Sequence, residues 1–443
     1  MVDILRYERN IKMTPFRFVL HYSILLYCIF ILSTVKSSVI VDSNYITALK
    51  RTPLLLSEPI TNFTKNVYKT LSTDPAYKNE NLILSPLSIH SALSMLYYGS
   101  PIQTTTNLEL TKLLGLNLKP IKSFRNGKYH FLNLFRYYEK SGKEHNAEVS
   151  LANRIYLQEG FKPKENYLTL LRQYFLTSAD VVDFADPVNA AKQINGFVNK
   201  KTNGLIDSIV QPDNIDALTR LILINAIYFK AGWKYPFNPA DTFEMPFKLL
   251  DGTVVMHEKG MDVSAKFRHG KSARLRARIL ELPYTNTDLN MYIMIPEEEN
   301  NLETLNNLAA SFDIREIKNI LKRSSSQNIN VNMPAFESSC EAKMNDLLQS
   351  LGAPSMFDVQ KANFSLITDD ELFVGEVLHK AKIRVDEKGS EAAAVTGISV
   401  GVRGYPSVQE DYFNVDQPFI YAIYDTKNEL PLFIGRMLNP TIS

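Results

Sequence analysis

The sequence contains almost no cysteine. Cys28 and Cys340 are the only two among 443 residues, and Cys28 lies in an apolar N-terminal segment that we expect to be removed. The mature chain then retains only Cys340, which excludes an intrachain disulfide. A domain of this length buries a large enough core to fold without such cross-links. We interpret Cys340 as a bystander thiol rather than a nucleophile.

The net charge is also small. The formal value is +2, with 45% hydrophobic and 22% charged residues, as in an ordinary globular protein. This balance excludes a chain that binds polyanions through bulk charge, and it predicts no nucleic-acid partner. The H-E-x-x-H, phosphate-loop, dinucleotide-binding and Cys/His zinc patterns are absent from the sequence as well. We therefore expect neither a metal nor a cofactor.

The N-terminus carries an apolar run over residues 18–35, preceded by four basic residues. A small-residue cleavage pattern ends at Ser37, so we interpret residues 1–37 as a secretory signal peptide, with Met1 or Met13 as the initiator. An uncleaved membrane anchor is the alternative, because the run is close to the minimum spanning length. A histidine inside the run and the cleavage pattern favour the signal. Cleavage would leave no membrane segment and predicts a secreted, extracellular protein.

Two glycosylation sequons agree with secretion. Asn62-Phe-Thr and Asn363-Phe-Ser are acceptor patterns, whereas Asn439 is followed by a proline that blocks it. Residues 38–58 form an N-terminal extension, and neither a linker nor a repeat follows it. The chain is thus expected to be a glycoprotein.

Apolar residues recur at helical spacing in some segments and form strand-like runs in others. Helical spacing occurs around residues 63–71, 89–96, 194–205 and 344–351, and strand-like runs cover 221–229, 279–284, 290–296, 329–336, 382–387 and 419–425. Ser338 and Glu341 fit a capping box for a helix that would end at Gly352. Helices concentrate early and strands late, which predicts an α+β fold rather than a regular βαβ alternation.

One stretch matches an enzyme motif. Gly397-Ile-Ser399-Val-Gly401 fits the G-x-S-x-G turn of hydrolases, which requires a helix after the serine and a histidine further along the chain. Residues 403–406 do not resemble a helix, and the last histidine is His379. We therefore reject a hydrolase.

A second stretch, residues 266–278, is strongly basic and contains no acidic residue. Its last three arginines alternate with apolar residues, so a single strand would place their guanidiniums on one face. Such a row would bind a sulfated polysaccharide. A solvated outer strand face is the alternative interpretation. The six basic residues are Lys266, Arg268, Lys271, Arg274, Arg276 and Arg278.

Several long stretches, in the same order along the chain, resemble the signatures of the serpin superfamily. These stretches are residues 81–100, 194–210, 221–237, 280–284, 386–394 and 417–440. On this density of matches the chain is identified as a member of that superfamily, similar to secreted inhibitory serpins such as those of arthropods. The resemblance implies one serpin domain over 59–443, a monomer, and a protease inhibitor rather than an enzyme.

The resemblance also implies three β-sheets, eight or nine helices and a reactive loop over about 387–410. Trp233, the only tryptophan, matches the breach, where the reactive loop first enters the main sheet. Five further residues match the shutter, where that sheet parts. They are Ser85, Pro86, Ser88, Asn225 and His379.

The reactive-loop hinge has an alternating pattern that suits a strand. In serpins a cleaved loop inserts into the main sheet, so its inward side chains must be small and uncharged. Counting alternately from Ser390 gives four small inward residues, and the intervening set, which includes Glu391, is expected to face solvent. The hinge positions are Glu387, Gly389, Ser390, Glu391, Ala392, Ala393, Ala394 and Thr396.

The reactive bond follows from the hinge. In inhibitory serpins the residue before that bond lies fourteen positions after the hinge glycine, and Gly389 plus fourteen is Arg403. Trypsin-like proteases bind such an arginine through an acidic pocket. The predicted reactive bond is therefore Arg403–Gly404, and the predicted partner is a trypsin-like serine protease held as a covalent acyl complex. Insertion of fourteen residues would carry that protease at least about 45 Å at roughly 3.3 Å per residue.

The alternative function is a non-inhibitory serpin that acts as a carrier or storage protein. Such members typically have prolines, bulky residues or charges at the hinge. The small hinge residues here favour an inhibitor.

Overall fold

The computed structural model describes residues 56–116, 127–145, 147–216, 218–297, 300–324, 327–390 and 411–441. The predicted signal peptide, the hinge from Glu391 onward and the Arg403–Gly404 bond lie outside these residues. Within them, no helix has the length and apolar character that crossing a membrane requires. The same residues contain no cluster of three or more His, Cys, Asp or Glu that would hold a metal ion.

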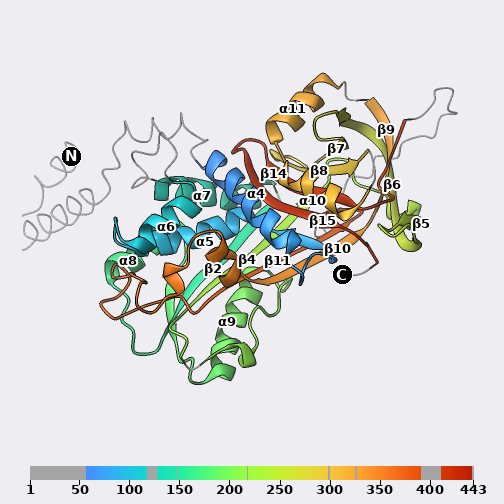
Figure 1. The fold of residues 1–443 in the computed structure, drawn as a ribbon. Helices are drawn as coiled ribbons and strands as arrows, with labels where there is room; N and C mark the ends of the chain where they lie inside the picture. Colours follow the sequence, from blue (N-terminus) through green and yellow to red (C-terminus); the bar gives the residue numbers. More distant parts are fainter. Residues whose placement is uncertain are drawn as a thin grey trace, which may run out of the picture. The chain divides into compact units, whose positions relative to one another are not determined.

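Nine α-helices are present in the described part of the chain (Figure 1). They are α4 (Ser57–Thr73), α5 (Pro86–Gly99), α6 (Thr105–Leu113), α7 (Gly127–His145), α8 (Glu165–Leu170), α9 (Pro187–Lys201), α10 (Leu302–Ala310), α11 (Ile314–Arg323) and α12 (Asn345–Ser350). A π-helical turn, Leu171–Phe175, follows α8. The start of α5 is fixed by its sequence: the Ser85 hydroxyl accepts a hydrogen bond from the Ser88 N–H, and Pro86 occupies the first helical position.

Six strands form one sheet, in the order β10, β11, β12, β4, β2, β3. Their bounds are β10 (Phe336–Lys343), β11 (Glu376–Asp386), β12 (Gly389–Ser390), β4 (Leu221–Gly232), β2 (Glu148–Gln158) and β3 (Ala179–Val182). Over most of its length β11 pairs directly with β4 in a parallel arrangement. At one end, however, β12 lies between them and pairs antiparallel with both.

The other strands form two sheets that share the long strand β6. The bounds are β1 (Leu82–Leu84), β5 (Phe243–Lys248), β6 (Val254–Ser272), β7 (Ala277–Pro283), β8 (Leu289–Pro296), β9 (Gln327–Pro334), β13 (Asp411–Asn414), β14 (Phe419–Asp425) and β15 (Leu430–Met437). Together with the six-stranded sheet they make the α+β arrangement that was predicted.

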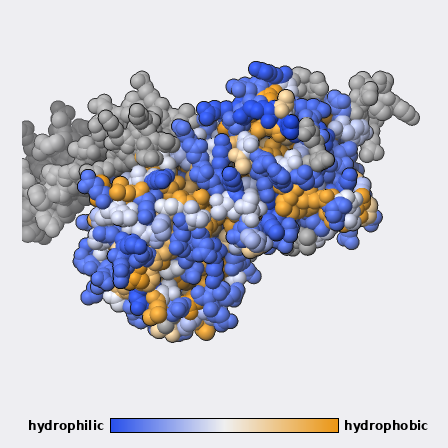
Figure 2. All heavy atoms as spheres, in the orientation of Figure 1, coloured by the Kyte–Doolittle hydropathy of each residue, from blue (hydrophilic) through white to orange (hydrophobic). Residues whose placement is uncertain are grey.

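Two hydrophobic cores lie on opposite faces of the six-stranded sheet. The larger contains α5, which contacts both this sheet and β15. The smaller lies under α9 and includes Ile222, Ile224 and Leu378. We call these two sides the core face and the α9 face. Figure 2 shows hydrophilic residues over most of the visible surface, with apolar residues in small separate patches.

Two predictions of local structure are wrong. Ser338 and Glu341 do not cap a helix, because both lie in β10, where they pair with Ile383 and Lys380 of β11. The basic segment 266–278 is not one strand either. It ends β6, turns at residues 273–276 and begins β7, so its arginines do not alternate along one face.

Candidate functional site

The hinge of the predicted reactive loop already forms part of the six-stranded sheet. Gly389 and Ser390 make up β12, with Ser390 opposite Ala231 of β4 and Val385 of β11. A Cβ at position 389 would overlap the Ala231 carbonyl oxygen, so only glycine fits there. Ser390 is fully buried on the core face. The strand position that insertion requires is therefore filled by a small residue.

A buried tyrosine holds Ser390 in place. The hydroxyl oxygens of Tyr284 and Ser390 are 2.6 Å apart and share a hydrogen bond. Tyr284 stacks on Trp233, with ring centroids 4.5 Å apart and an angle of 11° between the planes. The indole N–H of Trp233 in turn donates to the carbonyl of Asp386, 2.9 Å away. The tryptophan assigned to the breach thus lies directly against the start of the hinge.

Glu387 is fixed on the same end of the sheet. Its carboxylate accepts a hydrogen bond from the Thr242 hydroxyl at 2.9 Å, and its carbonyl accepts one from the Phe237 N–H at 2.9 Å. The Lys388 carbonyl accepts from the Trp233 N–H at 3.0 Å. Residues 386–390 are therefore held by backbone and side-chain contacts.

Replacing Tyr284 by phenylalanine should loosen the hinge. The change removes one hydrogen bond of about 1 kcal/mol and leaves the Ser390 hydroxyl without its partner. We expect the amides of residues 389–390 to exchange with deuterium about fivefold faster, as measured by mass spectrometry of peptides. Tyr167→Phe is the matched control, since it removes a buried bond of 2.9 Å to the Met95 carbonyl. Equal exchange at the hinge in both variants would contradict this role of Tyr284.

The predicted shutter residues meet in one buried network. The His379 ring lies between β11, β4 and α5: its Nε2 accepts from the Ser85 N–H at 3.3 Å, and its Nδ1 contacts the Asn225 side-chain oxygen. Because a backbone N–H can only donate, Nδ1 must carry the ring proton and donate to Asn225. Asn225 Nδ2 donates to Ser88 Oγ at 2.6 Å. Pro86 is buried at the first position of α5 and does not itself hydrogen-bond within this network.

Sequence reasoning missed one member of this network. Asn153, on β2, accepts hydrogen bonds from Asn225 Nδ2 at 2.6 Å and Ser88 Oγ at 3.0 Å, and it donates to Ser91 Oγ at 2.7 Å. The network therefore ties β2, β4 and β11 to α5. Separating β4 from β11 would break the contact between His379 and Asn225. The hydrogen bonds of Asn153, which join β2, β4 and α5, would stay intact.

Burial keeps two histidines of this region neutral. Desolvation lowers the pKa of His379 to about 3 and that of His90, on α5, to about 4. In the unfolded chain both would titrate near 6.5. As the pH falls below that value, the unfolded state binds protons first, so stability present at neutral pH is lost progressively toward the folded pKa values.

We expect the free energy of unfolding to fall as the pH is lowered from 6.5 to 4. Each neutral buried histidine contributes a slope of about 1.4 kcal/mol per pH unit. Urea titrations of the wild type and of His379→Gln at several pH values measure this slope. The free energy of unfolding of the variant should depend less steeply on pH, by the slope that one histidine contributes. Identical slopes would show that His379 does not carry the acid sensitivity.

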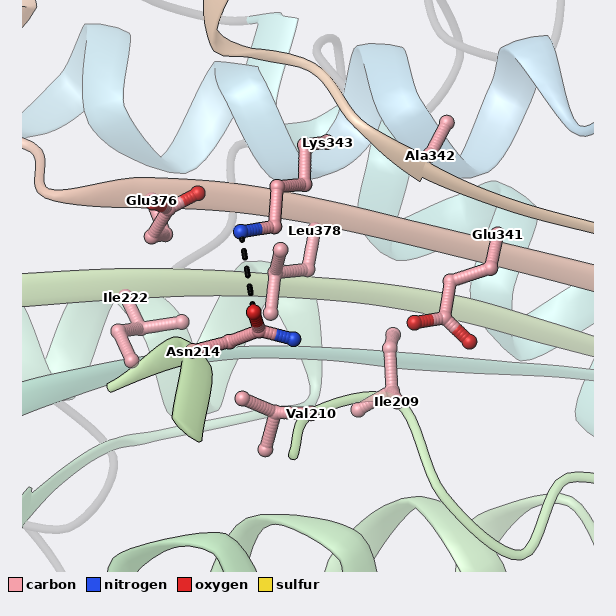
Figure 3. Close-up of a pocket in the computed structure, with 9 residues that line it drawn as sticks. All are labelled: Ile209, Val210, Asn214, Ile222, Glu341, Ala342, Lys343, Glu376 and Leu378. Carbon is pink, nitrogen blue, oxygen red and sulfur yellow. Dashed lines mark hydrogen bonds between the residues drawn. The ribbon is translucent and has the colours of Figure 1, made fainter. Parts of the chain in front are cut away.

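On the α9 face, the segment that follows α9 crosses the junction of β4 and β11. Asn195 holds it, because its side-chain oxygen accepts from the N–H groups of Ile209 and Val210 at 2.8 and 3.1 Å. Further along, Asn214 accepts a hydrogen bond of 3.4 Å from Lys343 of β10 (Figure 3). The cavity between these strands has a volume of about 20 Å³, room for little more than one water. The segment that follows α9 therefore covers the junction of β4 and β11 on the α9 face.

Glu376, at the start of β11, lines the same cavity (Figure 3). Desolvation raises the pKa of its carboxyl group, and the nearby Lys343 ammonium opposes that shift. The arrangement offers no nucleophile and no room for a substrate. It is a covered strand junction rather than a catalytic pocket.

The basic segment 266–278 forms a hairpin whose cations are largely engaged with their neighbours. Arg274 lies in the turn and pairs with Asp313 and Glu316 at 3.2 and 3.7 Å. Lys271 pairs with Glu297 at 2.7 Å. Arg278 lies over the ring of Phe413. The row of three guanidiniums on one face is therefore wrong, because a turn interrupts the strand.

The two sequons lie at separate places on the surface. Asn62 is exposed on α4, and Asn363 is half-buried in the segment between α12 and β11. Cys340 is buried in β10, and burial raises the pKa of its thiol to about 12. That environment is the opposite of the one that activates a nucleophilic cysteine.

Comparisons with known proteins agree with this geometry. A family model described as serpin (serine protease inhibitor) matches residues 58–440. Neuroserpin of Mus musculus is 34% identical over 393 residues, which cover 86% of this chain and 91% of neuroserpin. The leukocyte elastase inhibitor of Xenopus laevis is 29% identical over 388 residues, covering 87% of this chain and 99% of the relative. The chain belongs to the serpin family.

Solved structures show the same fold. Native protease nexin-1 with heparin superimposes with a TM-score of 0.76 at 27% identity, covering 88% of this chain and all of the other. Human thyroxine-binding globulin complexed with its ligand has a TM-score of 0.78 at 24% identity, covering 88% of this chain and 99% of the globulin. The family is one of protease inhibitors rather than enzymes, and the chain has its fold.

Proposed function

We propose that the protein is a secreted suicide-substrate inhibitor of trypsin-like serine proteases, with Arg403–Gly404 as the bond that is attacked. The protease serine would add to the Arg403 carbonyl, the amide bond would break, and the Gly404 amine would leave with a proton. The remaining ester joins Arg403 to the protease. The observation that supports the proposal is β12, in which Ser390 is already buried as a strand residue between β11 and β4.

Insertion of the cleaved loop would extend β12 along β4 in the same register. Ser390 lies opposite Ala231, so position 397 would come opposite Ile224 and position 399 opposite Ile222. Both isoleucines lie under α9. Gly397 and Ser399 are small, as that covered position requires. In this register α9 would cover the lower part of the second set of loop side chains, and only the upper part of that set would face solvent.

The small hinge residues also favour an inhibitor over a carrier. The thyroxine-binding globulin likeness lies below 25% identity and supports the fold alone. A bulky or charged residue in place of Ser390 would not fit the buried site beside Tyr284. The carrier alternative predicts a tightly bound small molecule and no covalent complex with a protease.

The rest of the proposal is that residues 1–37 are a signal peptide, that Asn62 and Asn363 carry glycans and that the mature protein is an extracellular monomer. Contact of residues 266–278 with a sulfated polysaccharide stays a prediction. It draws support from the heparin in the protease nexin-1 structure, but the ion pairs of Lys271 and Arg274 compete with it.

Cleavage by trypsin tests the position of the reactive bond. After brief exposure, the released C-terminal fragment should begin at Gly404 when its N-terminus is sequenced. A fragment that begins at another residue of the loop, with no cleavage after Arg403, would overturn the assignment.

A further inference from the structure

One edge of the six-stranded sheet is open beside the start of β2. The outermost strand, β3, pairs only with Ile155–Gln158 at the end of β2. The earlier part of β2 pairs with β4 on its other side. Within the described residues, no second strand lies beside that earlier part. An edge of this kind presents backbone N–H and C=O groups that another strand could pair with.

The hydrogen bonds of the same strand show which backbone groups face this edge. The N–H of Glu159, directly after β2, donates to β3 at 2.8 Å. The Asn153 carbonyl faces the same side, where it accepts from the Thr177 hydroxyl at 2.6 Å. Backbone groups alternate in direction along a strand, and β2 runs beside β4 without a register shift. The N–H and C=O groups of Val149 and Leu151 therefore point to the open edge.

A hollow of about 90 Å³ lies at this edge, with room for several water molecules. Val149 and Leu151 line it together with apolar side chains from α5, α7 and the π-helical turn. The buried members of that apolar wall are Met95, Phe135 and Phe175. The hollow thus combines strand-pairing groups with an apolar recess. An extended peptide has the matching parts, a backbone and an apolar side chain.

The opening of the hollow carries a strained and exposed leucine. Leu176 follows the π-helical turn in a left-handed conformation, with φ of 52°. That conformation is unfavourable for a residue with a side chain, and 37% of the leucine surface is exposed. Both π-helical turns and left-handed residues other than glycine concentrate at functional sites. A bound ligand would cover this leucine.

Two opposite charges complete the lining of the hollow. Glu139 of α7 and Lys201, the last residue of α9, both line it and are both exposed. A short peptide with free ends carries the complementary groups, one carboxylate and one ammonium. The open stretch of β2 is shorter than an ordinary strand, so it suits a short peptide better than a strand of another protein.

We propose that this hollow binds a short extended peptide with free ends and an apolar central side chain. The peptide pairs with Val149 and Leu151 as a further edge strand. Its central side chain occupies the apolar recess, and its carboxylate and ammonium groups meet Lys201 and Glu139. The site lies beside β2, apart from the junction of β4 and β11, and it does not depend on the proposed inhibition of a protease.

Isothermal titration calorimetry with the tripeptide Ala-Leu-Ala tests the pairing with β2. We expect the wild type to bind it at millimolar concentration. Methylation of the leucine nitrogen should weaken binding about tenfold or more, because it removes the N–H that pairs with the strand and adds bulk there. Aspartate in place of the central leucine should also weaken binding, since its charge would enter the apolar recess. Equal binding of Ala-Leu-Ala and its methylated form, or no binding of either, would overturn the proposal.

A double-mutant cycle tests the position of the peptide. Lys201→Gln should weaken binding of Ala-Leu-Ala about two- to fivefold, but it should not affect the C-terminally amidated peptide, which lacks the carboxylate. Lys200→Gln is the matched control, because Lys200 is exposed on the same turn of α9 but does not line the hollow. Thermal midpoints of both variants report any change in folding. If Lys201→Gln affects both peptides equally, or affects neither, the site is wrong. No protease enters this experiment, so its outcome is separate from that of the proposed function.

Discussion

Replacing Arg403 by alanine should abolish inhibition of trypsin. The acidic pocket of a trypsin-like protease binds the guanidinium through charge-assisted hydrogen bonds, and alanine leaves that pocket unpaired. We expect the second-order rate constant of inhibition to fall about a thousand-fold or more, measured from the loss of trypsin activity over time. The fold and the hinge should be unchanged, because Arg403 lies thirteen residues beyond Ser390.

Ser399→Ala is the control for this change. It alters the same loop and removes the serine of the G-x-S-x-G pattern, but it leaves the arginine that the protease binds. Inhibition of trypsin should therefore stay near the wild-type rate. Equal loss of inhibition in both variants would show that Arg403 is not the residue that directs the protease to the loop.

Replacing Ser390 by arginine should convert the inhibitor into a substrate. Ser390 is fully buried and its hydroxyl shares a hydrogen bond with Tyr284, so a guanidinium at this position would enter the core face. Insertion would bury an unpaired charge at a cost of several kcal/mol. Deacylation depends on the protease alone and should continue at its normal rate. We expect cleavage after Arg403 without a covalent complex and without the gain in thermal stability that insertion gives.

The neighbouring substitution Glu391→Arg introduces the same charged side chain on the other face of the loop strand. It therefore shows whether the face, rather than the charge alone, decides the effect of Ser390→Arg. If insertion continues the register of β12 along β4, position 391 would come opposite Lys230, a half-exposed residue, so a long side chain should be accommodated there. The Glu391→Arg variant should therefore remain an inhibitor. Finding that both variants inhibit as well as the wild type would show that the two faces of the inserted loop do not differ.

Much of the site could be predicted from the sequence because its residues lie in long continuous stretches. Asn225 and Trp233 lie in one such stretch, and His379 lies shortly before another; the structure places all three at contacts between β4, β11 and the hinge. The prediction that Ser390 points inward depends only on the alternation of side chains along a strand, and Ser390 is buried.

Other residues could not be found in this way because their contacts join distant parts of the chain. Asn153 bonds to Asn225, and Tyr284 bonds to Ser390. In both pairs the partners come together only through the pairing of strands.

The failed predictions have local causes. The basic segment alternates as a strand would, but the chain turns where Arg276 adopts a left-handed conformation, with φ of 48°. Ser338 and Glu341 have the spacing of a capping box, yet pairing with β11 along the whole of β10 fixes them in a strand. In each case contacts with a neighbouring strand or turn outweigh the short pattern.

Incubation with trypsin, followed by boiling in SDS and electrophoresis, tests the central claim most directly. We predict a band at the combined mass of trypsin and the inhibitor cut after Arg403, because the ester survives when the inserted loop has distorted the protease. Under the same conditions Ser390→Arg should give only the cleaved inhibitor and active trypsin. Cleavage of the wild type after Arg403 with no such band, and with trypsin fully active, would contradict the account.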